Sequence, residues 1–411
     1  MVLYRLFSNN KTYLILLLIN VFSALGSIIL YKIIGIVYTE EELYVFTFYK
    51  RILSFIAPIS LLGLGVTLVR KVSVDKKKSN SYTLISIFGA LIIPLFALIF
   101  YIFFPVEFDI VFFAGENLNQ MATPFILNLI GLSFFSIYIS LLRGLSKFIY
   151  ASFINLVFII VIPLILLLFS FSLSNFLNIY GILLILISIL LFSTEKIEKF
   201  KKEIEIKPFF AEGLNRLIGD ISYYFLLLGP SYFLLILTND LKIAAAVSFC
   251  QVILNSTIIL IKPISFIKLT YTAQLTNIKN IIDLKKDFYI VALLTFIAYV
   301  FIYLMLKLSI QFIITFFFSN SILEYLNEIN TFLIVVPFFG LYISSRSYLD
   351  GVTNKALMSI VNLIGLIIFV ISVFIFNRIT TSFQSVNISF ILCFIIMDVI
   401  IIILFLKNIK L

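Results

Sequence analysis

The sequence contains no histidine and no tryptophan, and only two of its 411 residues are cysteines. Zinc, haem and iron–sulfur centres depend on histidine and cysteine ligands, so the composition argues against all three. A catalytic pair of serine or cysteine with histidine is excluded as well. Cys250 and Cys393 both lie in apolar runs, and we expect two buried thiols and no disulfide.

Charged residues are also scarce: they make up 12% of the chain, whereas hydrophobic residues make up 62%. A soluble domain is about half apolar and about a quarter charged, so a chain of this composition cannot hide its apolar surface from water. The composition therefore predicts a membrane protein with little sequence left for an extramembrane domain. A phosphate-binding glycine-rich loop that ends in Lys-Ser or Lys-Thr is also missing from the sequence, which argues against ATP hydrolysis.

The sequence is rich in long apolar runs that are separated by polar clusters. A membrane helix needs about 20 apolar residues, and a chain of this length accommodates roughly a dozen such helices with short loops. The runs do not alternate between polar and apolar residues as membrane β-barrel strands do. We therefore predict an all-α polytopic membrane protein. The predicted spans are residues 12–35, 43–69, 81–104, 121–142, 148–170, 176–193, 214–237, 242–267, 288–314, 328–348, 355–376 and 386–406.

Basic residues dominate every second predicted loop and both chain ends, whereas the loops between them are mainly acidic. Because cationic loops stay in the cytoplasm, we predict that both termini are cytoplasmic. The net charge of +10 then reflects topology and contact with anionic lipids, and we expect no nucleic-acid partner. The residues assigned to basic loops include Arg70, Lys71, Lys76, Lys77, Lys78, Arg143, Lys147, Arg216, Lys268 and Arg346.

The two halves of the sequence resemble each other. Ser152-Phe-Ile-Asn-Leu156 parallels Ser359-Ile-Val-Asn-Leu363, and Pro58-Ile-Ser60 parallels Pro263-Ile-Ser265, both at an offset close to half the chain length. Six spans per half is an even number, so both halves enter the membrane in the same orientation. We predict two parallel six-helix repeats around a central cavity, in residues 1–193 and 214–411. The cytoplasmic linker at 194–213 has the charge pattern of an amphipathic helix or of a solvated connection. Repeats of this kind open a cavity alternately to the two sides of the membrane, which indicates transport.

A few ionisable residues fall inside the predicted spans, where each costs at least about 2.5 kcal/mol and is normally turned toward protein or a wet cavity. Lys50 and Arg51 lie two turns into the second span, and Lys262 lies deep in the eighth. One of the first two can snorkel to the interface. Arg51 is the stronger cavity candidate, because its planar guanidinium matches phosphate oxygens. Pro58 and Pro263 are predicted to kink equivalent helices, either to line the cavity or simply to pack.

Three further residues are candidates for charge recognition or ion coupling. Arg216 and Asp220 are spaced to pair on one helix face at the start of the seventh span. That pair is either interfacial, or a site in which Arg216 contacts phosphate and Asp220 binds a cation or a proton. Asp398 has no basic neighbour in sequence, and a lone acid in a membrane helix is a coupling-ion candidate. We expect no catalytic group and no metal site.

The second predicted span ends with Gly63-Leu-Gly65-Val-Thr-Leu-Val-Arg70, and the fourth ends with Leu141-Leu-Arg143-Gly144-Leu. Together with twelve spans in two parallel halves, these residues resemble the multidrug/oligosaccharidyl-lipid/polysaccharide exporter (MOP) superfamily, to which the MATE transporters belong. Within it, the chain is most similar to the Wzx-type polysaccharide flippases. The resemblance covers essentially the whole chain, and the two additional spans of the lipid II flippases are missing.

This resemblance implies a MATE-like fold and a specific activity. Such flippases move undecaprenyl-pyrophosphate-linked oligosaccharide repeat units of O-antigen, lipopolysaccharide or capsule across the bacterial inner membrane. By analogy of residue type, the pyrophosphate would be bound by Arg51, Lys262, Arg216 and Lys50. Asp220 or Asp398 would couple transport to a Na⁺ or H⁺ gradient, with no other cofactor. The expected partners are membrane lipids and other polysaccharide-assembly proteins.

Three alternatives stay open at this point, and one of them is a structural membrane subunit, which explains the two-half design poorly. An ion-coupled multidrug or metabolite antiporter of the same fold would need acidic cavity residues to bind organic cations, and this chain has more deep cations than anions. A membrane polysaccharide polymerase or ligase typically needs a long external loop that carries catalytic groups. The longest external loop here, residues 105–120, is acidic and has no basic partner. We therefore predict a transporter and not an enzyme.

Overall fold

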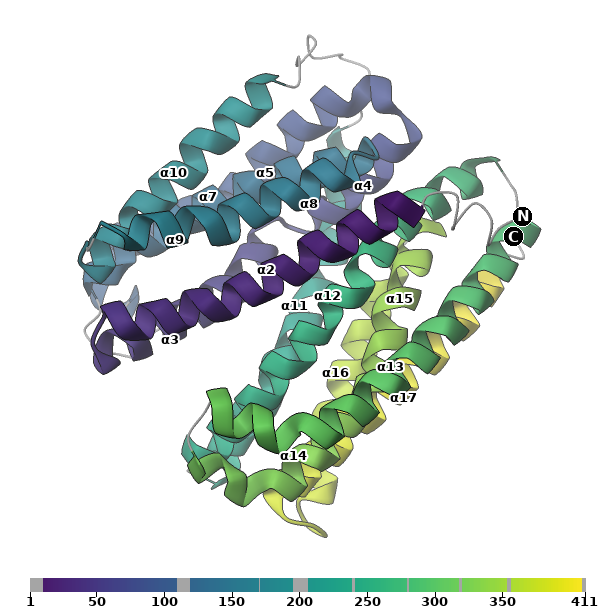
Figure 1. The fold of residues 1–411 in the computed structure, drawn as a ribbon. Helices are drawn as coiled ribbons and strands as arrows, with labels where there is room; N and C mark the ends of the chain where they lie inside the picture. The colour runs from purple at the N-terminus through teal and green to yellow at the C-terminus, as the bar shows by residue number, and fades with distance from the viewer. Residues whose placement is uncertain are drawn as a thin grey trace. The chain divides into compact units, whose positions relative to one another are not determined.

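The computed structural model describes residues 10–108, 119–169, 171–194, 206–238, 241–278, 281–317, 320–352 and 356–408. Every regular element in these residues is helical (Figure 1). Nine of the described helices are long and apolar enough to cross a membrane, and one bent helix pair makes a tenth candidate. Two more, of 33 and 38 residues, also exceed the length of about 20 residues that a crossing needs. The prediction of an all-α polytopic membrane protein is confirmed.

The chain divides into two compact units, one of residues 11–217 and the other mainly of residues 218–411. The division falls inside helix α11, close to the predicted start of the second half at residue 214. Of the predicted linker, residues 195–205 lie outside the described residues, and residues 206–213 form the beginning of α11. The first unit contains α2 (Asn10–Val37), α3 (Glu40–Ser60), α4 (Leu64–Val74), η1 (Lys76–Lys78), α5 (Ser79–Phe103), α7 (Asn119–Gly144), α8 (Phe148–Leu156), the π-helical turn η2 (Val157–Val161), α9 (Ile162–Leu167), α10 (Leu173–Thr194) and the start of α11 (Ile206–Thr238).

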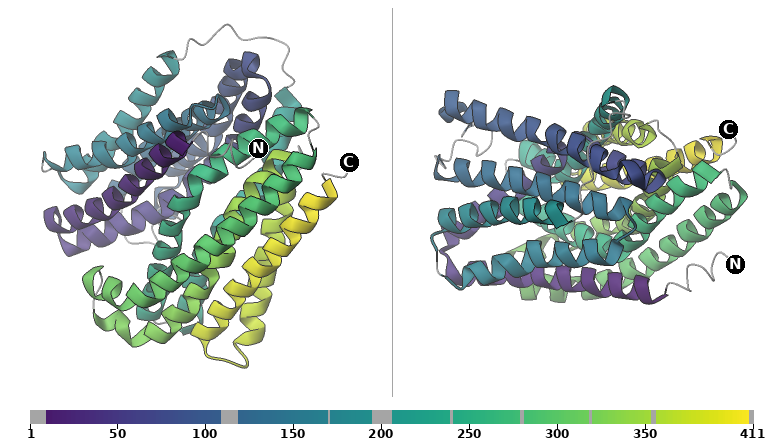
Figure 2. Two further views of the ribbon diagram at one scale, coloured as in Figure 1. Left: turned by 45° about the vertical axis from the view of Figure 1, so that its right-hand side comes forward. Right: turned by 90° about the horizontal axis from the view of Figure 1, so that it is seen from above.

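The second unit continues from α11, and its helices, coloured green to yellow, run alongside one another in Figures 1 and 2. Helix α15 lies at its centre and packs against α12, α13 and α17. Helix α7 has the matching place in the first unit, where it packs against α3, α4, α5 and α10. The elements of the second unit are α12 (Leu241–Ile278), α13 (Ile281–Phe317), η3 (Asn320–Tyr325), α14 (Leu326–Phe332), η4 (Leu333–Val335), α15 (Val336–Val352), α16 (Leu357–Phe376) and α17 (Ser382–Asn408).

Equivalent close contacts in the two units support the internal repeat. Gly144 at the end of α7 approaches the Val72 side chain and the Val69 carbonyl oxygen of α4. Gly351 at the end of α15 approaches the Thr272 side chain and the Leu269 carbonyl oxygen of α12 in the same way. In each unit, a glycine at the end of the central helix thus allows that helix to contact the backbone of the neighbouring helix.

The second predicted span is broken in the first unit. Helix α3 ends at Ser60, two residues after Pro58, and α4 begins at Leu64 at an angle of 45° to it. Gly63, in the turn, has a φ of 70°, a conformation that glycine adopts without strain. A Cβ at Gly63 would also overlap the carbonyl oxygen of Gly213. The corresponding helix of the second unit, α12, continues through Pro263 without a break.

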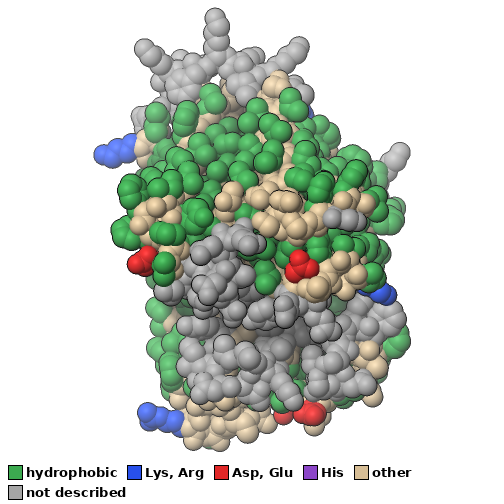
Figure 3. Space-filling model, turned by 90° about the vertical axis from the view of Figure 1, so that its left-hand side faces the viewer, with side chains coloured by type: hydrophobic (Ala, Val, Ile, Leu, Met, Phe, Trp, Pro, Cys, Tyr) green, Lys and Arg blue, Asp and Glu red, His purple; other side chains and the backbone are tan. Residues whose placement is uncertain are grey.

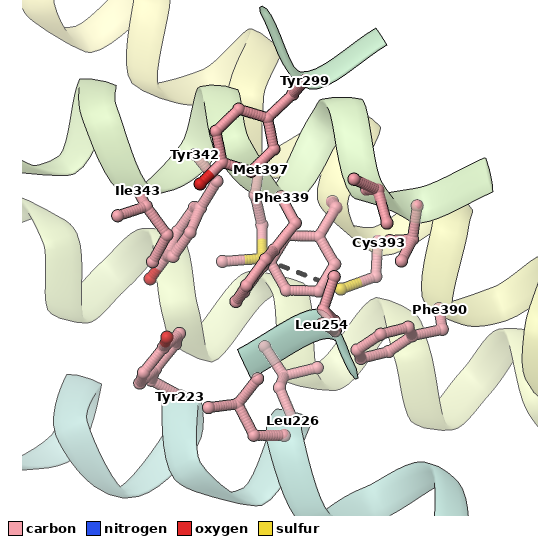
Figure 4. Close-up of a cluster of buried hydrophobic side chains, with 14 of the residues drawn as sticks. Tyr223, Leu226, Leu254, Tyr299, Phe339, Tyr342, Ile343, Phe390, Cys393 and Met397 are labelled. Carbon is pink, nitrogen blue, oxygen red and sulfur yellow. Dashed lines mark hydrogen bonds between the residues drawn. The ribbon is translucent and has the colours of Figure 1, made fainter. Parts of the chain in front are cut away.

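The core of the second unit contains many aromatic side chains and both cysteines, and Figure 4 shows part of it. Phe394 of α17 packs edge-on against Phe339 and Tyr342 of α15, at centroid distances of 5.3 and 5.4 Å. Cys393 contacts the sulfur of Met397 at 3.7 Å. Cys250 and Cys393 are buried free thiols, as predicted.

Large hydrophobic side chains also cover outward faces of the described helices, for example Phe96, Phe312 and Leu308. Figure 3 shows one such face, on which hydrophobic side chains predominate and charged ones are few. Exposed apolar patches of this extent mark contact with another apolar phase. For helices of this length, that phase is the lipid bilayer.

Candidate functional site

The first unit contains a cavity of about 170 Å³ whose lining comes from α2, α3, α7, α9, α10 and η2. Most of its wall is apolar or aromatic, whereas Lys50, Ser54 and Asn128 are polar. Pockets that bind whole drug-sized ligands usually measure about 300–1,000 Å³. The cavity therefore has room for one charged group or a small ion with water, and not for a whole oligosaccharide.

Lys50 is the one charged residue among those that line this cavity. Its ammonium lies 5.9 Å from the centre of the Phe46 ring, which is a cation–π distance. No ion pair connects it to an acidic side chain in the part of the chain that the structure describes. A partly buried cation that has no acidic partner among the described residues favours an anionic ligand, because the ligand supplies the missing charge.

Asn128 and Tyr49 fix the wall of the cavity at a proline in α7. Asn128 Nδ2 donates to the carbonyl oxygens of Pro124 (2.9 Å) and Leu177 (2.8 Å) and so ties α7 to α10. The Tyr49 hydroxyl donates to the same Pro124 carbonyl at 3.0 Å. Asn128 Oδ1 is buried and has no hydrogen-bond partner among the described residues. The ammonium of Lys50 is thus the charged donor that the lining offers.

Another part of the lining comes from an irregular helix. Residues 157–161 form the π-helical turn η2, and Pro163 directly after it has no N–H to donate. The Tyr180 hydroxyl donates to the Phe158 carbonyl oxygen within this turn at 3.3 Å. π-Turns inside α-helices are frequent at functional sites, and here Ile159 and Pro163 line the cavity.

The side chains of Arg51, Lys262 and Pro263 lie outside the described residues. Arg51 follows Lys50 in α3, and Lys262 and Pro263 lie within α12. Their predicted roles therefore stay predictions.

Arg216 belongs to a cluster of basic side chains around the carboxylate of Glu212, which is 7% exposed. Glu212 is bound by Lys71 (3.1 Å), Arg70 (3.3 Å) and Arg216 (3.5 Å). Two of these bases come from α4, so the cluster ties the start of α11 to the helix after the break. Arg216, predicted to lie in a basic loop and to pair with Asp220, is buried in α11 and pairs one turn earlier.

Asp220 pairs within the second unit. Arg346 Nη2 lies 3.0 Å from Asp220 Oδ1, and Arg346 Nε lies 3.4 Å from Asp350 Oδ2. The guanidinium also lies 5.0 Å from the centre of the Tyr223 ring. Arg346, predicted to lie in a basic loop, is therefore inside α15 and fills the space between two carboxylates. A cation at Asp220 would have to displace this guanidinium.

A second buried ion pair joins three helices of this unit. Lys268 Nζ of α12 contacts both carboxylate oxygens of Asp287 of α13, at 2.7 and 2.6 Å. The Tyr348 hydroxyl of α15 donates to Asp287 Oδ2 at 2.6 Å. Lys268 is 3% and Asp287 0% exposed. The predicted loop position of Lys268 is wrong, because α12 extends to Ile278.

Asp398 of α17 lies in different surroundings. Its side chain is 4% exposed, and neither carboxylate oxygen has a hydrogen-bond partner among the described residues. Phe394 and Ile401, one turn before and after it, are fully buried. Asp398 thus remains the coupling candidate without a basic partner, whereas Asp220 has one.

Sequence reasoning missed Glu212, Asp287 and Asp350 as buried acids. Two of them had a detectable signal, because Glu212–Arg216 and Arg346–Asp350 have the four-residue spacing of helical ion pairs. Asp287 gave no such signal, since its partners lie on other helices.

No protein-family model matches the chain, and no curated protein matches it. Solved structures do. One of them is a MOP superfamily transporter from Pyrococcus furiosus Vc1 (DSM3638), which is described by the reverse polarity of its binding pocket. Its sequence is 13% identical and its TM-score is 0.80, and the match covers 97% of this chain and 94% of that one. An outward-facing multidrug resistance MATE family transporter is 15% identical with a TM-score of 0.76, over 97% and 96%. A mutant of the Vibrio cholerae MATE transporter VcmN is 13% identical with a TM-score of 0.77, over 97% of each chain. This multi-pass membrane protein therefore has a MATE-like fold.

Proposed function

We propose that this chain is a membrane transporter that flips undecaprenyl-pyrophosphate-linked oligosaccharide repeat units across the bacterial cytoplasmic membrane by alternating access. The observation that carries the proposal is Lys50, a cation that has no acidic partner among the described residues and lines a cavity whose other lining residues are uncharged. This ammonium attracts a phosphate oxygen and repels an organic cation. The MATE-like fold supports transport, because the matching structures are described as transporters.

The size and polarity of the cavity limit what it would hold. A volume of about 170 Å³ accommodates a phosphate group beside the ammonium of Lys50. The remaining sugars and the polyprenyl chain would stay outside this cavity, with the chain in lipid. In this proposal Arg51 and Lys262 provide further cations for the pyrophosphate. The protein works with both termini in the cytoplasm and alongside other polysaccharide-assembly proteins.

The buried acids favour the same substrate class. Glu212, Asp220, Asp287 and Asp350 are each bound to a basic side chain. An organic cation would have to break one of these ion pairs, whereas an anion at Lys50 breaks none. The description of the Pyrococcus furiosus neighbour shows that pocket polarity can differ within this fold.

A multidrug or metabolite antiporter is the second candidate. Asp398 favours it, because this carboxyl group has no basic partner among the described residues and could meet a cationic substrate. A polymerase or ligase has no such supporting observation.

The test is a leaflet-accessibility assay in proteoliposomes that contain only this protein. The probe is a fluorescent polyprenyl-pyrophosphate-linked disaccharide, and an impermeant lectin reports the headgroups that cross. A charged hydrogen bond contributes about 1.5–3 kcal/mol, so Lys50→Met should slow crossing about 10- to 100-fold. Lys50→Arg should retain part of the rate. Lys76→Met in the exposed η1 turn is the matched control and should behave as wild type.

Crossing that is unchanged by Lys50→Met would contradict the cationic-cavity argument. Failure of the folded protein to move the lipid, together with uptake of a fluorescent organic cation, would establish the antiporter instead. The double substitution of Arg51→Ala with Lys262→Ala tests two further predicted cations in the same assay.

A further inference from the structure

The first unit gathers basic side chains at one end of its helices. In residues 64–74, 136–156 and 206–217, six side chains are basic and one, Glu212, is acidic. These segments lie together, because the end of α7 approaches a backbone carbonyl oxygen of α4, and Glu212 of α11 binds two bases of α4. The basic residues of this end are Arg70, Lys71, Arg143, Lys147, Lys207 and Arg216.

The single carboxylate leaves most of this positive charge uncompensated. Glu212 is bound by Lys71, Arg70 and Arg216, at 3.1, 3.3 and 3.5 Å, so one negative charge is shared by three positive ones. The Arg216 side chain is 4% exposed, whereas that of Lys71 is 30% exposed. The lysine ammonium has three N–H donors. A ligand from outside can therefore reach Lys71 while Glu212 holds it in place.

The second unit indicates that the fold itself does not require these bases. The matching glycine contacts at the ends of α7 and α15 align the two units. In this alignment Asp350 takes the place of Arg143, directly before the glycine, and a threonine and a tyrosine of α12 take the places of Arg70 and Lys71. Basic loops that orient a membrane protein are expected in both halves. They do not explain why a base of one unit corresponds to an acid in the other.

The surroundings of the basic residues indicate the kind of ligand. Tyr150 and Phe153 of α8 are 43% and 52% exposed, and Leu214 of α11 is 48% exposed. They follow Lys147 and Lys207 within two turns of helix, so the bases lie where the apolar outer surface ends. Tyrosine is enriched at this level of a membrane protein. An anion beside such a surface is the phosphate of a lipid, whose acyl chains contact the apolar side chains.

We propose that this end of the first unit is a binding surface for the phosphate headgroups of anionic phospholipids. Lys71 and Lys147 contact the phosphate oxygens, and the partly buried Arg70 and Arg143 add to the positive potential. Charge-assisted hydrogen bonds to phosphate are strong, and clusters of basic residues beside a membrane helix attract anionic lipids. The lipid is a bound component of the membrane and not the transported molecule, so the inference does not depend on the proposed function.

Native mass spectrometry of the purified protein in detergent tests this surface. The probes are phosphatidylglycerol, whose headgroup is anionic, and phosphatidylcholine, whose headgroup has no net charge, at equal concentrations. The wild-type protein should retain phosphatidylglycerol in preference. Each base near an anionic lipid contributes about 1 kcal/mol, which is about fivefold in affinity. Lys71→Gln combined with Lys147→Gln should therefore weaken phosphatidylglycerol binding about 10- to 30-fold. Glu212 keeps two of its bases in this variant, which should fold. The single variant Lys147→Gln, at an exposed position, should weaken binding about fivefold.

The matched control removes the same charge from the second unit. Lys285→Gln combined with Lys286→Gln, in the second turn of α13, should retain phosphatidylglycerol as the wild type does. Equal losses in the two double variants would show a response to overall charge and overturn the proposal, as would unchanged binding in the Lys71 and Lys147 variants. A further arm adds inorganic phosphate. Phosphate binding by a wild-type protein that shows no preference for phosphatidylglycerol would indicate a site for a soluble anion and also overturn the proposal.

Discussion

Removing one member of the Lys268–Asp287 pair should destabilise the second unit far more than removing both. The single substitutions are Lys268→Met and Asp287→Leu, which leave one charge buried without its partner. The combined variant also carries Tyr348→Phe, because the Tyr348 hydroxyl donates to Asp287 and would otherwise lose its acceptor. All three replacements keep side-chain size roughly constant, so any difference between the variants reflects charge and hydrogen bonding.

The magnitude follows from burial. Lys268 and Asp287 are 3% and 0% exposed, with Nζ at 2.7 and 2.6 Å from the carboxylate oxygens. Breaking such a pair costs about 3–5 kcal/mol, whereas replacing it entirely with apolar residues is often neutral or stabilising by about 1–4 kcal/mol. For a folding unit of about 200 residues, 1 kcal/mol shifts the midpoint by roughly 2–4 °C. Each single variant should therefore melt about 6–20 °C lower than wild type. The combined variant should melt close to the wild-type temperature.

The assay is thermal unfolding of the purified protein in one detergent. Unfolding is monitored by circular dichroism, because the chain has no tryptophan whose fluorescence could report it. All variants are heated at one scan rate, because unfolding of a membrane protein can be irreversible and then depends on that rate. If the combined variant melts as low as the single ones, the cost comes from lost packing. If Lys268→Met melts within 2 °C of wild type (roughly 1 kcal/mol), the ion pair is not the buried one described above.

Two further substitutions test the connection between α4 and α11. Glu212→Gln leaves Arg70, Lys71 and Arg216 without their shared carboxylate. It should lower the free energy of unfolding by about 2–3 kcal/mol, and by less at high salt. Unfolding at two salt concentrations measures both effects. A loss that does not change with salt would argue against the electrostatic cause. Gly63→Ala should cost at least about 1–2 kcal/mol because of its positive φ, whereas Gly65→Ala, in the adjacent helix α4, should be nearly neutral. Equal melting temperatures for the two glycine variants would contradict this explanation.

The helices were predictable because apolar runs of membrane length leave the backbone no other regular structure in lipid. The internal repeat was predictable from Pro58 and Pro263 and from the Asn-Leu matches. The break after α3 was not predictable. Pro58 is followed by the break between α3 and α4, whereas the equivalent Pro263 lies in the continuous helix α12. The difference depends on Gly63 and on its contact with Gly213, a residue 150 positions away.

The pairing of charges could be predicted only in part. Arg216 has an acid four residues before it and another four residues after it, so spacing alone allows either Glu212 or Asp220 as its partner. The two basic residues of α4 gather at Glu212, and Asp220 is bound by Arg346 from a distant helix. Hydropathy then misplaced Arg346 and Lys268 in loops, because a window of residues cannot show that a charge inside a helix is neutralised by another helix.

Lys50 and Asp398 differ from these ion pairs in a way that bears on function. An ionisable group in a membrane helix costs energy, and pairing it with an opposite charge reduces that cost. Arg346 and Lys268 are paired in this way and hold helices together. Lys50 and Asp398 have no such partner among the described residues, so packing alone does not explain them. In the proposed function, the phosphate of the substrate supplies the missing partner of Lys50.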